Sequence, residues 1–197
     1  MRLLSFAVVC SLMVASVFCD KDPMKCQVQV NRMGGFAFCM FSQLNSVDND
    51  ETKIEAMTLN FQGRDIEIDT VTAVAFAFSN LTEFPSAVFD ENLFGNISRV
   101  KYYGGSLENV NKGSFKNAPG LRFVELLDMT INEISSDVFK GASQLEELTL
   151  ENCAIKKIAK DAFSGAENLK QLRLVGSTYP SDKFLLNLPD TVKVIKA

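Results

Sequence analysis

The sequence repeats a pattern of apolar residues every 24 residues over most of its second half. Successive blocks begin at Ile97, Leu121 and Leu145, and an earlier block begins at Val71 with two extra residues before the next one. Apolar side chains occupy positions 1, 4, 6, 11, 14 and 19 of all four blocks, which is 24 matches of 24. At an apolar content of 47%, chance would produce this in about one of 10⁸ cases. A fixed period of this length predicts a solenoid in which each repeat stacks on its neighbours.

The spacing inside a block predicts one short strand in each repeat. Positions 4 and 6, such as Leu148 and Leu150, alternate with other residues and point inward along a strand. An array of amphipathic helices does not fit, because the spacing mixes a period of two with wider steps. We expect five or six parallel strands with a stacked aromatic column behind them at position 19, formed by Phe89, Phe115, Phe139 and Phe163.

A short element recurs around position 19, as Ala162–Phe163–Ser164–Gly165 and Val138–Phe139–Lys140–Gly141. With the period and the spacing, it resembles the extracellular 24-residue subtype of the leucine-rich-repeat family, including secreted insect members and Toll-like receptor ectodomains. The resemblance covers Val71 to about Tyr179, with a weaker block near Ile54–Ile68. It implies an α/β solenoid, a short leucine-rich-repeat horseshoe whose parallel sheet lines the concave side. It also implies binding, with innate immunity as one setting.

Position 9 departs from the pattern of that family, which places asparagine there to bridge successive turns. In this chain the position holds Ser79, Gly105, Met129, Cys153 and Ser177. Serine and cysteine keep a side-chain donor, whereas glycine and methionine supply none. We therefore expect looser turns at Gly105 and Met129.

Residues 1–19 are predicted to be a secretory signal peptide. Arg2 precedes an apolar run from Leu3 to Phe18 that is too short to span a membrane. Cleavage after Cys19 would leave three cysteines, and cleavage after Ser16 would also keep Cys19. Loss of Arg2 changes the net charge from −4 to −5. A mildly acidic chain without a basic run is not expected to bind nucleic acid, and no later apolar run is long enough for a membrane span.

Residues 20–53 are predicted to form an amino-terminal cap, because the first strand of a solenoid would otherwise expose the core. Two β-prone segments flank the turn-forming stretch Asn31–Gly35, which predicts a β-hairpin. Pairing Val30 with Gly35 would place Cys26 directly opposite Cys39, within reach of a disulfide bond. The predicted cap is therefore a disulfide-linked hairpin.

The repeats are expected over residues 54–182 and a carboxy-terminal cap over residues 183–197. Within that cap, Pro189–Ile195 predicts a final short strand that closes the core. Cys153 falls in the repeat pattern and is expected to be a free structural thiol.

The chain contains no histidine. This argues against Ser-His-Asp and Cys-His catalysis and against the common zinc sites. The acidic cluster at Asp48, Asp50 and Glu51 lacks the spacing and central glycine of a calcium loop. We expect no enzyme, and no catalytic, cofactor-binding or metal-binding residues.

Positions between the core columns should face solvent on the strands, where the repeat does not require apolar residues. We expect ligand contacts at six of them: Phe78, Arg99, Tyr103, Phe123, Glu125 and Leu127. The four apolar residues are predicted to form one contiguous patch over three strands, typical of a protein interface. Coverage by the cap or by a neighbouring chain is the alternative. Two sequons, at Asn80 and Asn96, are candidate glycosylation sites.

These features predict a secreted, non-catalytic protein that recognises an extracellular or cell-surface protein. A secreted enzyme inhibitor and a structural or adhesive matrix component remain the alternatives, since a repeat fold by itself names no ligand.

Overall fold

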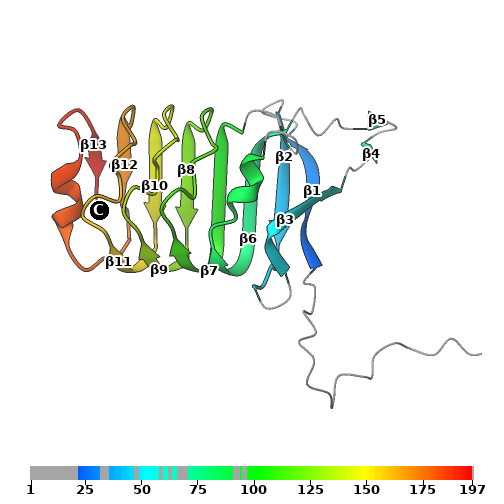
Figure 1. The fold of residues 1–197 in the computed structure, drawn as a ribbon, viewed down its shortest axis with the longest axis horizontal. Coiled ribbons are helices and arrows are strands. Elements are labelled where there is room, and N and C mark those ends of the chain that lie inside the picture. The colour runs from blue at the N-terminus through cyan, green and yellow to red at the C-terminus, as the bar shows by residue number, and fades with distance from the viewer. Residues whose placement is uncertain are drawn as a thin grey trace, which may run out of the picture.

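The computed structural model describes residues 22–31, 36–46, 49–57, 60–61, 64–65, 71–90, 94 and 97–196. The predicted signal peptide and Asn96 lie outside these residues. The repeats contribute to the main sheet the strands β6 (Val71–Glu83), β7 (Arg99–Val110), β8 (Phe123–Leu127), β10 (Glu147–Glu151) and β12 (Gln171–Arg173), and the carboxy-terminal cap adds β13 (Lys193–Ile195). They lie side by side in chain order and pair in parallel (Figure 1). The predicted parallel solenoid is therefore confirmed.

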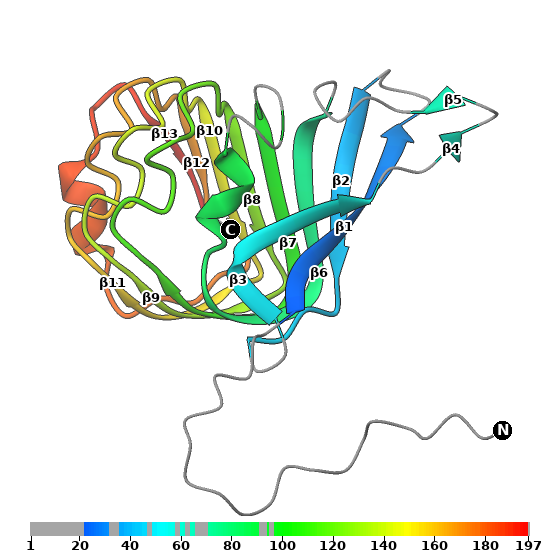
Figure 2. The ribbon, with the colours of Figure 1, turned by 45° about the vertical axis from the view of Figure 1, so that its right-hand side comes forward.

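Each turn continues from the main sheet into a second, shorter row of strands. This row contains β9 (Thr130–Ile134) and β11 (Ala154–Ile158), which run along one edge of the solenoid (Figure 2). β6 and β7 are long enough to take part in both rows, since β7 pairs first with β8 and then with β9. Helix in the described residues is limited to two 3-10 helices, η2 (Ser86–Phe89) and η3 (Asp182–Asn187). The turns are thus closed almost entirely by strands and loops.

The apolar columns read from the sequence form the core. Strand pairing places position 4 of each turn beside position 4 of the next, as Val100 beside Val124 and Val124 beside Leu148. In the four full blocks, the side chains at positions 1, 4 and 6 are at most 4% exposed. Burial of such apolar side chains is the main contribution to folding free energy, and no repeat could bury them alone.

The predicted aromatic column is confirmed. Ring centroids are 5.7 Å apart between Phe89 and Phe115, 4.9 Å between Phe115 and Phe139, and 5.9 Å between Phe139 and Phe163. Phe184 from η3 extends the column at 5.5 Å from Phe163. These separations fall in the range that aromatic rings favour, so the column ties every turn to the next.

The amino-terminal hairpin consists of β1 (Asp22–Asn31) and β2 (Phe36–Ser42), paired antiparallel. The predicted disulfide joins Cys26 and Cys39, with 5.6 Å between their Cα atoms. The predicted register is wrong, because Val28 and not Cys26 lies opposite Cys39. Cys26 is two residues from Val28, so it lies on the same face of the hairpin and reaches Cys39 diagonally.

β2 also occupies a place in the solenoid. It pairs in parallel with β6, so that Cys39 lies beside Val74 and Phe41 beside Phe76. The rings of Phe41 and Phe76 stack at 4.9 Å. The cap therefore continues core positions 4 and 6 of the repeats by one further turn.

The described part of the weaker block near Ile54–Ile68 does not lie next to β6 in the main sheet. β3 (Asn49–Met57) pairs in parallel with β1 at the outer end of the sheet, beyond β2. β4 (Asn60–Phe61) and β5 (Arg64–Asp65) form a separate two-stranded sheet. The place next to β6 is taken by β2 instead, because the hairpin already supplies inward-pointing apolar side chains in register.

Position 9 is bridged without asparagine. The hydroxyl of Ser177 accepts a hydrogen bond from the Cys153 amide and donates to the Leu150 carbonyl, both at 2.8 Å. The thiol of Cys153 donates to the Leu126 carbonyl at 3.2 Å. At Gly105 the expected loosening is absent, since β7 runs through it without a break.

The carboxy-terminal end is closed by η3 and β13, and β13 is the short strand predicted within Pro189–Ile195. Val192 is 9% exposed, and Phe184 is 2% exposed over the aromatic column. β13 pairs with β12 and places Val194 beside Leu172 in core position 4. Val194 is nevertheless 38% exposed, because β13 ends the sheet among the described strands.

Candidate protein-binding surface

The strand face is the solvent-facing side of the main sheet, formed by positions 3, 5 and 7 of each turn. Strand pairing places equivalent positions side by side, as Arg99 beside Phe123 and Phe123 beside Glu147. Each position therefore makes a row across the strands. The row at position 7 lies nearest the carboxyl ends of the strands, where the chain turns into the second row of strands.

Three of the predicted binding residues meet at that end. Tyr103 and Leu127 lie side by side in the position 7 row, and both are half-buried. The ring of Phe78 packs edge-on against Tyr103, with centroids 5.2 Å apart and planes at 77°. Phe78 remains 62% exposed. We call Phe78, Tyr103 and Leu127 the corner patch.

Phe123 does not belong to this patch, so the expectation of four contiguous apolar residues fails there. It lies in the position 3 row, four residues before Leu127 on β8, which is about 13 Å along a strand. Its ring lies under two guanidinium groups, with Arg99 4.3 Å and Arg122 5.4 Å from the ring centroid. Its exposed faces are therefore already in contact with cations of the same chain.

The two predicted charged residues lie on neighbouring strands and contact each other. A guanidinium nitrogen of Arg99 lies 3.3 Å from a carboxylate oxygen of Glu125. Both side chains are partly exposed, so this ion pair contributes little to stability.

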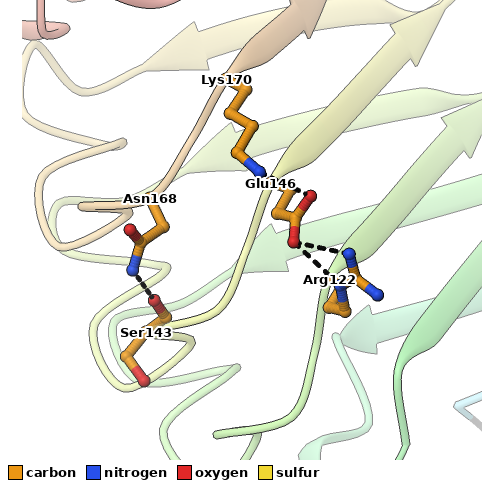
Figure 3. A network of polar contacts seen from close by, with 5 residues as sticks. All are labelled: Arg122, Ser143, Glu146, Asn168 and Lys170. Atoms are coloured by element: carbon orange, nitrogen blue, oxygen red, sulfur yellow. Dashed lines mark hydrogen bonds and ion pairs between the residues drawn. The ribbon is translucent and has the colours of Figure 1, made fainter.

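A polar network fixes the beginning of the strands at position 2 (Figure 3). Glu146 accepts hydrogen bonds from Arg122 at 2.7 and 2.9 Å and from Lys170 at 3.0 Å, which joins three successive turns. These hydrogen bonds hold the pKa of the Glu146 carboxyl below its ordinary value, and the bond from Lys170 has the largest effect. In the adjoining loops the Asn168 amide donates to the Ser143 carbonyl at 2.7 Å. The network aligns the turns at the beginning of the strands. The corner patch lies at the opposite end of the strands.

The residues at position 8 turn the chain out of the main sheet, and they share one backbone conformation. Their φ angles are positive in every turn: 49° at Phe78, 69° at Gly104, 53° at Asp128, 52° at Asn152 and 66° at Gly176. Glycine, asparagine and aspartate adopt this left-handed region readily, whereas a bulky aromatic residue does so at a cost. Phe78 is the aromatic residue of this column, and Gln43 of the cap, level with it, has the same conformation with a φ of 56°.

Gly104 makes room for the Phe78 ring. A Cβ atom at position 104 would lie 2.6 Å from the ring atom Cδ1 of Phe78. The absence of a side chain on the neighbouring turn thus allows the ring to lie across it and reach Tyr103.

Two acidic residues, Asp128 and Glu151, follow the corner patch along the same end of the strands. Asp128 is exposed and accepts a hydrogen bond from the Asn152 amide at 2.9 Å. Glu151 lies beside Leu127 in the position 7 row. Its nearest cation, Arg173, is 3.8 Å away and more than one third exposed.

The remaining predicted sites fall elsewhere. Asn80 is exposed on the second row of strands, where its Oδ1 accepts a hydrogen bond from Ser106 at 2.9 Å. Its glycosylation stays a prediction. Cys153 is a free, buried thiol, and burial raises its pKa to about 11.

The described ranges contain no group of three or more acidic, cysteine or histidine residues placed to hold a metal ion. Within the same part of the chain, no helix has the length and apolar character required to cross a membrane.

The comparison with protein families agrees with the fold. A family profile described as "BspA type Leucine rich repeat region" matches residues 82–184 with six copies. Among solved structures, an internalin from Listeria monocytogenes is similar, with 14% sequence identity and a TM-score of 0.36. The match covers 77% of this chain and 47% of the internalin, so this chain spans about half of its length. A comparison with curated proteins found no match. Because the family profile covers more than half of the sequence, the chain belongs to the BspA-type leucine-rich-repeat family.

Proposed function

We propose that this protein is a secreted, non-catalytic recognition protein that binds an extracellular or cell-surface protein through its strand face. The observation that carries the proposal is the corner patch. Phe78 is a large aromatic side chain, 62% exposed, on a rigid parallel sheet. Aromatic residues exposed beside charged ones are typical of the centres of protein interfaces.

Secretion is supported by the basic and apolar character of residues 1–19 and by the Cys26–Cys39 disulfide. Disulfides that stabilise a fold form in oxidising compartments. The extension to innate immunity rests on the family resemblance alone, and expression induced by infection would support it. If the partner is an enzyme, the protein acts as a secreted inhibitor. Inhibition assays against proteases and glycosidases would identify that activity.

A structural or adhesive component is the second candidate, and one observation favours it. β13 ends the sheet among the described strands and exposes Val194. An open sheet edge can pair with another chain. Concentration-dependent association in sedimentation experiments, abolished by Val194→Lys, would favour this candidate over recognition.

The proposed function is tested by capturing partners from extracellular fluid with the immobilised full chain and identifying them by mass spectrometry. A matched column should carry the double variant Tyr103→Ala/Leu127→Ala, whose melting temperature is measured in parallel. We expect at least one protein that the parent retains and the folded double variant does not. Retention of the same proteins by both columns would contradict recognition through the strand face.

A further inference from the structure

Phe78 combines two properties that folding alone does not explain. Its φ of 49° lies in the left-handed region, and its side chain is 62% exposed. The first property is unfavourable for an aromatic residue, and the second means that burial recovers little of that cost. Strained residues that persist in a rigid surrounding structure tend to mark functional positions.

The surroundings of Phe78 hold its ring in one place. Tyr103 packs against it at 5.2 Å, and the missing side chain of Gly104 leaves the space that the ring occupies. Leu127 lies beside Tyr103 on the next strand. The corner patch is thus an apolar surface that is fixed before any partner binds, which reduces the entropy lost on binding.

Two carboxylates, those of Asp128 and Glu151, and one lysine, Lys101, adjoin the corner patch. Asp128 follows Leu127 directly in the chain, and Glu151 lies beside Leu127 on the next strand. Adjacent strands are about 4.8 Å apart, so the backbones of Glu151 and Leu127 are about that far from each other. The lysine is Lys101, whose Nζ lies 5.9 Å from the centroid of the Tyr103 ring. Lys101 belongs to the row at position 5, toward the middle of the strands.

Resting on the proposed function, we propose that this corner binds a basic segment of the partner protein. One apolar side chain of the segment packs on Phe78, Tyr103 and Leu127. A lysine or arginine next to it pairs with Asp128 and Glu151. Charge complementarity of this kind selects partners and speeds their association, while the apolar anchor supplies most of the affinity.

The test uses the full chain and three families of synthetic 12-residue peptides. All carry one central leucine, phenylalanine or tryptophan, flanked by lysine and arginine in the first family, serine in the second and glutamate in the third. Fluorescence polarisation measures each Kd at low and at physiological salt. We expect the basic family to bind most tightly and to weaken as salt rises.

Two variants and two controls locate the binding. Phe78→Asn introduces the residue type found at the equivalent position 152, so the backbone conformation is retained, and it should weaken the basic peptides about tenfold or more. Asp128→Asn should weaken them several-fold. Leu186→Ser removes another exposed apolar side chain, and Glu108→Gln removes a carboxylate on the second row of strands. Both controls should leave the Kd unchanged.

Equal binding of the three families, binding by none, or unchanged binding in Phe78→Asn would overturn the inference. The proposed function is judged separately, by the capture experiment. If the capture experiment retains a partner that Phe78→Asn still binds and Tyr103→Ala/Leu127→Ala loses, the strand face recognises a protein but Phe78 is not its anchor.

Discussion

The hydroxyl of Tyr102 donates a hydrogen bond to the carbonyl oxygen of Ser79 at 3.0 Å, across the turn where position 9 is a glycine. Tyr102 is fully buried, at core position 6. Its side chain therefore bonds one turn to the next at Gly105, where no side-chain donor is available. This explains why β7 passes through Gly105 without the loosening that the sequence predicts.

Tyr102→Phe should lower the free energy of unfolding by about 1–2 kcal/mol, because it leaves a buried carbonyl without its partner. Urea unfolding followed by circular dichroism measures the change. Tyr103→Phe is the matched control on the same strand, since Tyr103 is half-buried on the strand face, and it should change stability little. Equal effects of the two substitutions would show that the Tyr102 hydrogen bond does not bridge the turns.

Phe139→Ala should destabilise the protein by about 3–5 kcal/mol, because it opens a cavity in the middle of the aromatic column. Phe139 is 3% exposed and stacks on Phe115 at 4.9 Å. Leu186→Ala, at a side chain 82% exposed, should change stability by less than about 0.5 kcal/mol. Thermal unfolding of both variants compares them, and a small effect of Phe139→Ala would contradict the stacked core.

The apolar columns and the aromatic column could be predicted because each needs only a residue type at a fixed spacing. The hairpin register could not, since a diagonal pair and a direct pair of cysteines fit the same sequence. Phe123 was grouped with Tyr103 because both are exposed aromatic residues, although they lie in different rows of the strand face. The conformation of Phe78 could have been inferred only from its column, where Gly104, Asp128, Asn152 and Gly176 are residues that tolerate positive φ.

Peptide mapping without reduction should recover Cys26 linked to Cys39, and native Cys153 should resist alkylation at pH 8. Cys153 is buried and its pKa is raised to about 11, so little thiolate is present or accessible. Unfolding in denaturant should expose it. Recovery of Cys153 linked to either of the other two cysteines would contradict the arrangement of the cap.

Stability should fall in acid partly through Asp137. Hydrogen bonds from Ser164 and then Lys112 hold the pKa of its carboxyl below the ordinary value, which favours the ionised form in the folded state. A lowered folded-state pKa contributes stability above the unfolded pKa, near 4, and loses it as pH falls further. Asp137→Asn should therefore show a shallower loss of melting temperature between about pH 5 and pH 3. Identical pH profiles for the variant and the parent would exclude this role.

The central claim is that this leucine-rich-repeat protein recognises a partner through Phe78, at the exposed corner of its strand face. The most direct measurement is the amount of partner that Phe78→Asn retains from extracellular fluid, relative to the parent and to Leu186→Ser. Melting temperatures confirm that all three are folded. We predict about tenfold less partner on Phe78→Asn and equal amounts on the other two. Equal retention by all three proteins would contradict the claim.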